Sequence, residues 1–467
     1  MREWDPRRLT TEEATPRRFV GVVVAAFAAI TSFVAWHHEA WRDEADAWLV
    51  VRDIDLARLF DWSRHAGTPT LWYGILTPLA RAGLPYESQQ VLHLGIAVAT
   101  VALFLLFAPL ARLPKTLTVF SYYFSYEYSV IVRSYALSIL LIFAATALWR
   151  HRAERPLTLA IILALLCNTN AQGFAVAAAF GVALVTERLF RASAIIGIGA
   201  VMAWWQVRTP PDPAREGARH VFNSQAIPWT LGNAFAPTLP TGAGVAVAGL
   251  VLLAATIMLH RSRNALIVLW TAIGALLALY SFVWLGGLRH SGFLLIVTIV
   301  AIWLGAHEID QRYASAAALL LNGALLISVF VAARYWIDET RAPFSGAGDM
   351  ARYIQGNSLE GVDIAAHNLT QCEAVLPYLP LRTRFWYAGL GEVGSYLKWD
   401  AAQERALEMP YPVAEERARR HFAGREWLLL FNVEMPDPAA HGFRLLHATA
   451  EPFEKTDERY WLYAPIR

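Results

Sequence analysis

Long apolar runs alternate with short polar segments over the first two thirds of the chain. Several of these runs hold about 18 residues or more without a charge, the length that an α-helix needs to cross a bilayer. About eleven runs can be laid down, at roughly 19–36, 89–110, 116–131, 134–149, 157–169, 173–187, 193–207, 242–259, 265–285, 291–306 and 313–333. The pattern predicts an α-helical polytopic membrane protein with about eleven transmembrane helices.

Arginine marks one side of these predicted spans. The N-terminal tail, 1–18, and the short segments after alternate runs carry Arg, whereas the segments between them are longer and mix charges. By the positive-inside rule the Arg-bearing segments face the cytoplasm, and the region after the last run is extracytoplasmic. The tail resembles the start of a signal sequence. Its small-x-small triplet, Ala26-Phe27-Ala28, lies in the middle of the run, so we expect an uncleaved first span.

The pattern changes at about residue 336, where charged residues, Pro and Gly become frequent. The short apolar stretch Trp427–Phe431 is typical of a buried strand, and 346–356 and 412–420 are typical of helices. Pro412 suits a first helical position. We therefore expect a transmembrane domain followed by a small extracytoplasmic α/β domain, with bounds at 19–335 and 336–467.

The amino-acid composition supports a membrane protein and gives little further information on function. Hydrophobic residues make up 56% of the chain and charged residues 17%, against roughly 25% charged in soluble domains. The net charge of +2 gives no support to nucleic-acid binding. The two cysteines have no metal-ligand spacing, and we expect no disulfide between them. Basic residues are almost all Arg, as in GC-rich bacterial genomes, so a bacterial plasma (inner) membrane is expected.

A dense acidic and aromatic segment, 37–88, follows the first run as the first outer loop. Its first part, 37–73, holds the carboxylates Glu39, Asp43, Glu44, Asp46, Asp53, Asp55 and Asp61, interleaved with Trp41, Trp48, Trp62 and Trp72. The stretch 70–82 is apolar, amphipathic and too short to span, so we expect a juxtamembrane helix there.

Asp43 and Glu44 are adjacent carboxylates just past a span. Such a pair can supply a general base and an anchor for a cation or a substrate hydroxyl. Asp46 follows three residues later and would share the same face of a helix with Asp43. The alternative is a solvated acidic loop. Asp53, Asp55 and Asp61 are expected to be solvated.

Two arginines stand at the outer ends of later runs. Arg133 lies between two spans, where a charge is costly and tends to be paired, to snorkel or to be functional. Guanidinium suits phosphate through its bidentate fork. Snorkelling at the interface and a structural pair with Glu127 remain alternatives. Arg289 and His290 follow two glycines that allow a close backbone approach.

An Asp43-Glu44 pair after the first span, then His65-x-Gly67-x-Pro69 and an aromatic surface helix, resembles the GT-C superfamily of integral-membrane glycosyltransferases. The pattern is most similar to the protein mannosyltransferase and lipid A aminoarabinose transferase branch. The resemblance covers the layout from about 19 to 310, but at residue level only a few short motifs.

That resemblance implies transfer, with inversion, of a sugar from a polyprenyl-phosphate-linked donor to a lipid, glycan or protein acceptor on the outer face. It implies that Asp43 is the catalytic base and Glu44 a neighbour that contacts metal or acceptor. A divalent metal ion at these two carboxylates stays open. The other implied contacts are Arg133, Tyr135, Arg289 and His290 to the donor phosphate, and Asp46, His65, Gly67 and Pro69 to the substrates.

Proteins of other classes compete with this interpretation. A lipid or glycan transporter or flippase would place charges along a midplane path and broken helices in related halves. Here the acids cluster on one side and no internal repeat is visible. A non-catalytic membrane scaffold would bind a partner without turning over a donor.

Overall fold

The computed structural model describes residues 2–208, 222–407 and 409–466. Between the predicted spans 193–207 and 242–259, the residues Arg215, Arg219 and His220 lie outside the described residues. The chain forms two compact units. We call 2–33, 92–206 and 222–336 the helical unit, and 34–91, 207–208 and 337–466 the sheet unit. The acidic segment and the C-terminal region therefore belong to one compact unit.

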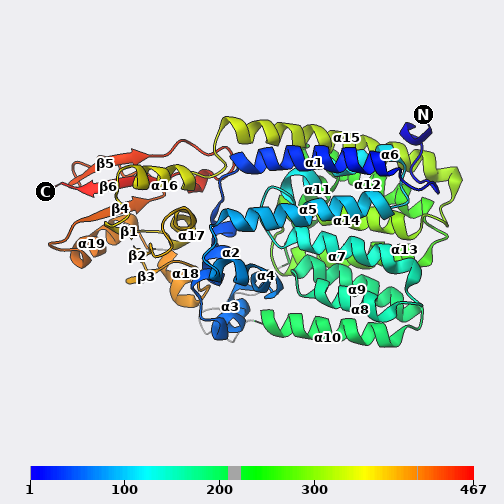
Figure 1. The fold of residues 1–467 in the computed structure, drawn as a ribbon, viewed down its shortest axis with the longest axis horizontal. Coiled ribbons are helices and arrows are strands. Elements are labelled where there is room, and N and C mark those ends of the chain that lie inside the picture. Colours follow the sequence, from blue (N-terminus) through cyan, green and yellow to red (C-terminus); the bar gives the residue numbers. More distant parts are fainter. Residues whose placement is uncertain (1, 209–221, 408, 467) are drawn as a thin grey trace. The chain divides into compact units, whose positions relative to one another are not determined.

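Apolar helices dominate the fold. Among the described residues, six helices are long and apolar enough to cross a membrane: α1 (Arg17–His37), α5 (Glu87–Phe107), α10 (Phe190–Val207), α12 (Thr241–Met258), α13 (Arg263–Phe282) and α15 (Gln311–Arg341). Shorter apolar helices are α7 (Tyr135–Leu148), α8 (Pro156–Cys167), α9 (Ala171–Thr186) and α14 (Leu288–Leu304). The helices of the helical unit lie side by side (Figure 1). The prediction of a helical multi-pass membrane protein is confirmed.

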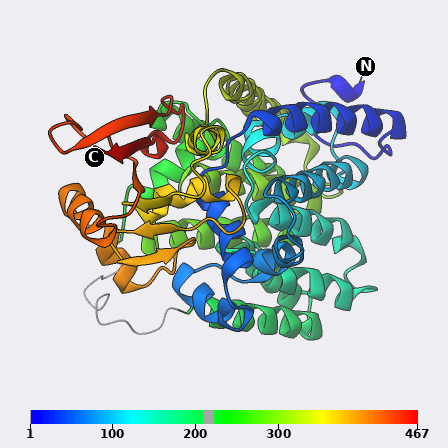
Figure 2. The ribbon, with the colours of Figure 1, turned by 60° about the vertical axis from the view of Figure 1, so that its left-hand side comes forward.

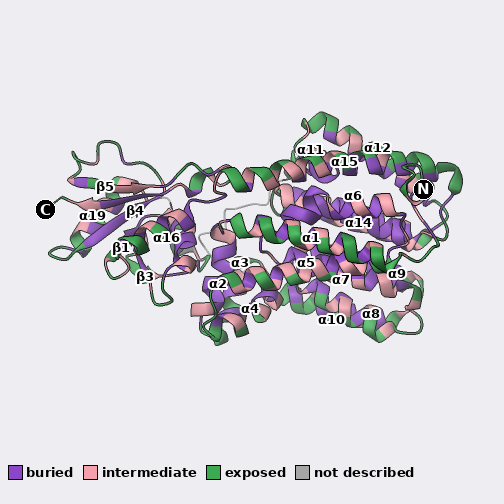
Figure 3. Ribbon diagram, turned by 45° about the horizontal axis from the view of Figure 1, so that its top comes forward, coloured by how far each residue is buried: buried purple, intermediate pink, exposed green. Residues whose placement is uncertain are grey.

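Burial separates the inner helices of the helical unit from the outer ones. Helix α14 is buried from Ser291 to Trp303, whereas α10 exposes Trp204 and Trp205 (Figure 3). Large apolar side chains on the outside of a soluble protein would be unfavourable, but lipid is as apolar as they are.

The predicted run at 116–131 is not one continuous helix. Helix α6 (Arg112–Val119) ends early, and Tyr123–Glu127 forms a π-helical turn, η3. The hydroxyl of Ser125 donates to the carbonyls of Ser121 and Phe120 at 2.9 and 3.1 Å. Side-chain bonds of this kind compete with regular helix hydrogen bonds, and they explain why an apolar run is interrupted here.

The sheet unit is built on a mixed six-stranded sheet with the order β3-β2-β1-β4-β6-β5, whose strands are labelled in Figure 1 and seen from another side in Figure 2. The strands are β1 (Asp363–Ala366), β2 (Phe385–Tyr387), β3 (Glu392–Gly394), β4 (Trp427–Phe431), β5 (Phe443–Ala448) and β6 (Trp461–Pro465). Strand β4 pairs in parallel with β1 and antiparallel with β6, and all five of its residues are buried. A central strand covered on both faces has a continuous apolar run, which is why its sequence predicted it.

Helices cover both faces of this sheet. Leu428 and Leu430 pack in a core cluster with α16 (Ala347–Gly356), and Leu429 and Phe431 pack on the other face with α19 (Tyr411–His421). Both helices were predicted, with Pro412 in the first turn of α19. Shorter elements complete the unit: α17 (Leu369–Cys372), η6 (Glu373–Tyr378), α18 (Ala401–Leu407) and η7 (Thr456–Glu458).

The acidic segment forms α2 (Arg42–Asp53), η2 (Leu56–Arg58), α3 (Leu59–Ala66) and α4 (Leu71–Arg81). Helix α4 confirms the helix predicted at 70–82. Ala45 and Leu49 of α2 belong to the same core cluster as Met350 of α16 and Leu428 of β4. The acidic segment thus completes the core of the sheet unit and is not a separate solvated loop.

Candidate active site

Helix α2 begins at the acidic pair. Trp41, in an extended conformation, precedes it, and Asp43 and Glu44 occupy the first turn. Carboxylates stabilise this end of a helix because the backbone N–H groups there carry a partial positive charge. The carboxylate of Glu44 also accepts from the backbone N–H of Trp41 at 3.3 Å, as in the return half of a capping box.

Glu44 is held by a buried histidine. His38 Nε2 lies 3.0 Å from Glu44 Oε2, and His38 Nδ1 lies 2.8 Å from Glu339 Oε1, with all three side chains fully buried. Burial alone would lower the pKa of His38, but the two carboxylates outweigh it and raise the pKa to about 10. His38 therefore carries a proton on each ring nitrogen at neutral pH and donates to both acids. The carboxylate of Glu44 is thus bonded within the protein, to His38 and to the backbone of Trp41.

Asp43 and Asp46 differ sharply in exposure. The side chain of Asp43 is 30% exposed and lies 3.9 Å from Arg42 Nε. Asp46 is 7% exposed, and its Oδ1 accepts from the backbone N–H of Leu397 at 3.2 Å. Glu44 is fully buried. Of the three carboxylates Asp43, Glu44 and Asp46, Asp43 is therefore the one that a substrate can reach.

Two more acids gather beside this end of α2. Burial, with Asp46 and Asp43 nearby, raises the pKa of Glu373 well above its usual range. Burial likewise raises the pKa of Glu458 to about 8, although it accepts from Ser345 and from the backbone N–H of Arg42. With its pKa at about 8, Glu458 is mostly protonated at neutral pH. Sequence reasoning missed them because they lie more than 300 residues from Asp43.

The motif His65-x-Gly67-x-Pro69 forms a helix stop. Gly67 ends α3 with φ of +67° in the left-handed region, and its N–H donates to Ser63. His65 is half-buried and Pro69 buried. The backbone geometry alone accounts for the glycine, because other residues are strained there.

We expect Gly67→Ala to cost about 1 kcal/mol of stability without lowering the activity of folded protein. Gly74→Ala is the matched control. It lies in α4, has open space where a Cβ would be, and should be neutral or slightly stabilising. Thermal unfolding in detergent measures the stability of both variants. Lost activity at unchanged stability would show instead that Gly67 contacts a substrate.

Asp53 corrects a sequence expectation. It was expected to be solvated, yet its side chain is 11% exposed and accepts from Arg52, Arg384 and Ser395. The partners Arg384 and Ser395 lie more than 300 residues away, so no local pattern could reveal them. Asp55 and Asp61 are exposed as expected.

In the helical unit the structure brings together Tyr135 and His290, two of the predicted phosphate ligands. Their side chains lie 2.9 Å apart, from the first residue of α7 and the first turn of α14. His290 Nδ1 accepts from the backbone N–H of Gly287 at 2.7 Å, so its Nε2 carries the proton and donates to Tyr135.

Arg289 stands beside an acid that the sequence did not assign to it. Its Nε lies 3.9 Å from Glu127 Oε1, and Glu127 also accepts from the Tyr122 hydroxyl at 2.6 Å. The hydroxyl of Tyr128 donates to the Arg289 carbonyl. Arg133 is half-buried, two residues before α7. The run of tyrosines from Tyr122 to Tyr128 was the available signal for this cluster.

No group of three or more His, Cys, Asp or Glu is arranged to hold a metal ion in the part of the chain that the structure describes. The implied metal ligands, Asp43 and Glu44, point to different surroundings: Glu44 is bonded to His38, and Asp43 lies near Arg42.

These features define a multi-pass membrane protein with a mixed α/β domain after its last apolar helix. No family model matches the sequence, and no curated protein matches it. Among solved structures, ArnT from Cupriavidus metallidurans bound to undecaprenyl phosphate is similar, with a TM-score of 0.54 and 14% identity over 95% of this chain and 97% of that one. ArnT in the apo state aligns over the same shares with a TM-score of 0.46. The resemblance to the lipid A aminoarabinose transferase branch is thus confirmed at the level of the fold.

Proposed function

We propose that this chain is a membrane glycosyltransferase that moves a sugar from a polyprenyl-phosphate-linked donor to a lipid, glycan or protein acceptor on the outer face of a bacterial plasma membrane. The observation that carries the proposal is the ArnT fold, which extends over 95% of the chain and whose crystal structure holds undecaprenyl phosphate. The partly exposed carboxylate of Asp43 at the start of α2 supports it, as do Arg289 and His290 in the first turn of α14.

Asp43 is the base in this proposal. Its carboxylate takes the proton of an acceptor hydroxyl while the hydroxyl oxygen bonds to the anomeric carbon of the sugar. The bond between that carbon and the donor phosphate breaks, and its electron pair leaves with the polyprenyl phosphate. Attack from the face opposite the phosphate inverts the anomeric carbon. The exposure of Asp43 supports this choice over Glu44 and Asp46.

Glu44 and His38 act as positioning residues. The buried bonds from His38 to Glu44 and Glu339 fix the first turn of α2, and with it the direction of Asp43. Asp46 supports the same turn through the backbone of Leu397. A base that is held by its neighbours loses less entropy when the substrate arrives.

The leaving phosphate needs a cation more than an acid, because the phosphate diester donor releases polyprenyl phosphate, a monoester anion of low basicity. Arg289 in the first turn of α14 offers a guanidinium together with the positive end of a helix. The donor phosphate would replace Glu127 as its counter-ion. We assign Arg133, Tyr135 and His290 to the same phosphate.

We expect Arg289→Ala to raise the KM for the polyprenyl-phosphate sugar by about 10- to 100-fold, because a charge-assisted hydrogen bond is lost. Initial rates against donor concentration in nanodiscs measure the change. Arg261→Ala, which removes an exposed arginine elsewhere in the helical unit, should leave the KM unchanged. An unaltered donor KM in Arg289→Ala would show that the phosphate binds elsewhere.

A further inference from the structure

A polar pocket lies in the sheet unit, at the far end of α2 from Asp43. Its volume is about 400 Å³, within the roughly 300–1,000 Å³ of small-molecule sites. Asp53 stands ten residues after Asp43 on the same helix, so the two carboxylates are separated by about 15 Å of helix axis. The pocket is therefore distinct from the proposed catalytic end of α2.

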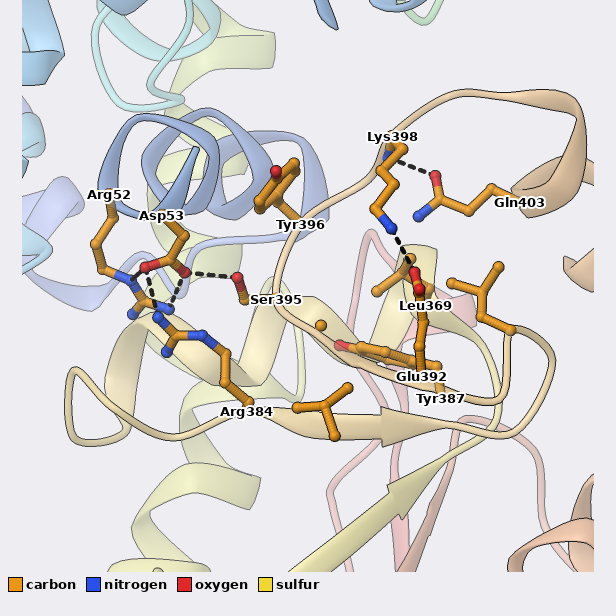
Figure 4. A pocket seen from close by; sticks show the side chains of 13 residues that line it. Arg52, Asp53, Leu369, Arg384, Tyr387, Glu392, Ser395, Tyr396, Lys398 and Gln403 are labelled. Atoms are coloured by element: carbon orange, nitrogen blue, oxygen red, sulfur yellow. Dashed lines mark hydrogen bonds and ion pairs between the residues drawn. The ribbon is translucent and has the colours of Figure 1, made fainter. Parts of the chain in front are cut away.

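Five charged side chains line the pocket, and each of them takes part in an ion pair (Figure 4). Arg52 and Arg384 both bind Asp53, with Arg384 Nη2 2.5 Å from its Oδ1. Lys398 pairs with Glu392. Three cationic and two anionic side chains leave a net charge of +1, and their ion pairs place donors and acceptors side by side.

Two buried polar groups among the lining residues have no partner in the protein. The hydroxyl of Tyr387 and the amide nitrogen of Gln403 are both buried without a hydrogen bond. The carbonyl oxygen of Gln403 is fully used, because it accepts from the backbone N–H groups of Lys398 and Trp399. Leaving such groups unpaired costs free energy, which a ligand with hydroxyl groups would recover.

The Lys398–Glu392 ion pair lines the same pocket as these two groups, and dashed lines in Figure 4 join Lys398 to Glu392 and to Gln403. Each side chain of the ion pair is 47% exposed. Exposed ion pairs contribute little to stability, so a ligand that enters the pocket can part this one at low cost. The parted Lys398 and Glu392 then remain at hand as a donor and an acceptor.

We infer that this pocket binds a sugar residue of a glycan, through the hydroxyl of Tyr387, the amide of Gln403 and the charged pairs around them. Sugar hydroxyls both donate and accept, which matches this mixed lining, and the half-buried ring of Tyr396 offers a face for the C–H groups of a pyranose. The inference does not depend on the transfer reaction proposed above, since it concerns binding in the absence of a donor.

The test is a titration of the full-length protein in nanodiscs with the methyl glycosides of glucose, mannose, galactose and N-acetylglucosamine, read by saturation-transfer NMR. We expect at least one of these sugars to bind. Tyr387→Phe and Gln403→Glu should each weaken that binding about tenfold. Tyr387→Phe should not lower the unfolding temperature, because the hydroxyl makes no bond within the protein. Gln403→Glu keeps the oxygen that holds Lys398 and Trp399.

Tyr411→Phe is the matched control. It removes a tyrosine hydroxyl of the same unit that bonds Asn432 and does not line the pocket, so sugar binding should stay unchanged. The inference is overturned if none of the four sugars binds the wild-type protein, or if Tyr387→Phe binds them as tightly. Binding of inorganic phosphate in their place would also overturn it.

Discussion

Asp43→Asn is expected to lower sugar transfer by about 100- to 10,000-fold, the usual loss when a general base is removed. Asparagine keeps the size of the side chain but cannot take the proton of the acceptor hydroxyl. The substitution lies in a partly exposed first turn, so the protein should still fold and insert. The measurement is formation of glycosylated acceptor from an undecaprenyl-phosphate sugar in nanodiscs, with donor binding followed separately.

Asp61→Asn provides the comparison. It makes the same chemical change at an exposed acid of the same segment, 71% exposed, and should retain full activity. Turnover by Asp43→Asn at the wild-type rate would remove Asp43 from the mechanism. A wild-type protein that binds the donor without any turnover would favour a flippase or a scaffold.

His38→Leu is expected to destabilise the sheet unit by about 3–5 kcal/mol, the usual cost of leaving a buried charge without its partner. Glu44 and Glu339 would stay buried while their shared donor is lost. For a unit of this size the midpoint of thermal unfolding should fall by about 6 to 20 °C. Scanning calorimetry in detergent at neutral pH measures it.

The same histidine makes stability depend on pH. The carboxylates raise the pKa of His38 in the folded state to about 10, above the ordinary value of 6.5. The contribution of protonated His38 to the free energy of unfolding is therefore fully present below pH 6.5. It declines as the pH rises toward 10, where folded His38 loses its proton. The wild-type midpoint should therefore fall between pH 7 and pH 10 more steeply than that of His38→Leu.

His37→Leu is the control for His38→Leu. It changes the adjacent, exposed histidine and should shift stability by less than about 0.5 kcal/mol. Equal stability of His38→Leu and wild-type protein at neutral pH would mean that the bonds of His38 to Glu44 and Glu339 do not stabilise the fold.

Local patterns predicted the elements whose residues carry their own signal. The five apolar residues of β4, the amphipathic stretch of α4 and the proline at the start of α19 each led to the correct element. The run at 116–131 misled because its tyrosines count as apolar, while the serine bonds that break the helix depend on local geometry.

Pairings across the sequence were beyond prediction. Tyr135 and His290 were assigned to one site by resemblance, and the structure brings their side chains within 2.9 Å. The distant partners could not be anticipated: Glu339 lies 301 residues from His38, and Arg384 lies 331 residues from Asp53, on elements that give no sign of the contact. Exposure then separated Asp43 from Glu44, which their adjacency in sequence could not do.

The place of α2 in the core of the sheet unit has a consequence for synthesis. Leu49 packs with Met350 and Leu428, which follow it by roughly 300 residues or more. At about 5–20 residues per second the ribosome needs roughly 15–60 s to supply the first of these partners. During that time the apolar face of α2 is uncovered, next to a newly inserted first helix. Chains that stop before residue 347 would keep that face open, and they would be natural clients for the chaperones and proteases that monitor the membrane surface.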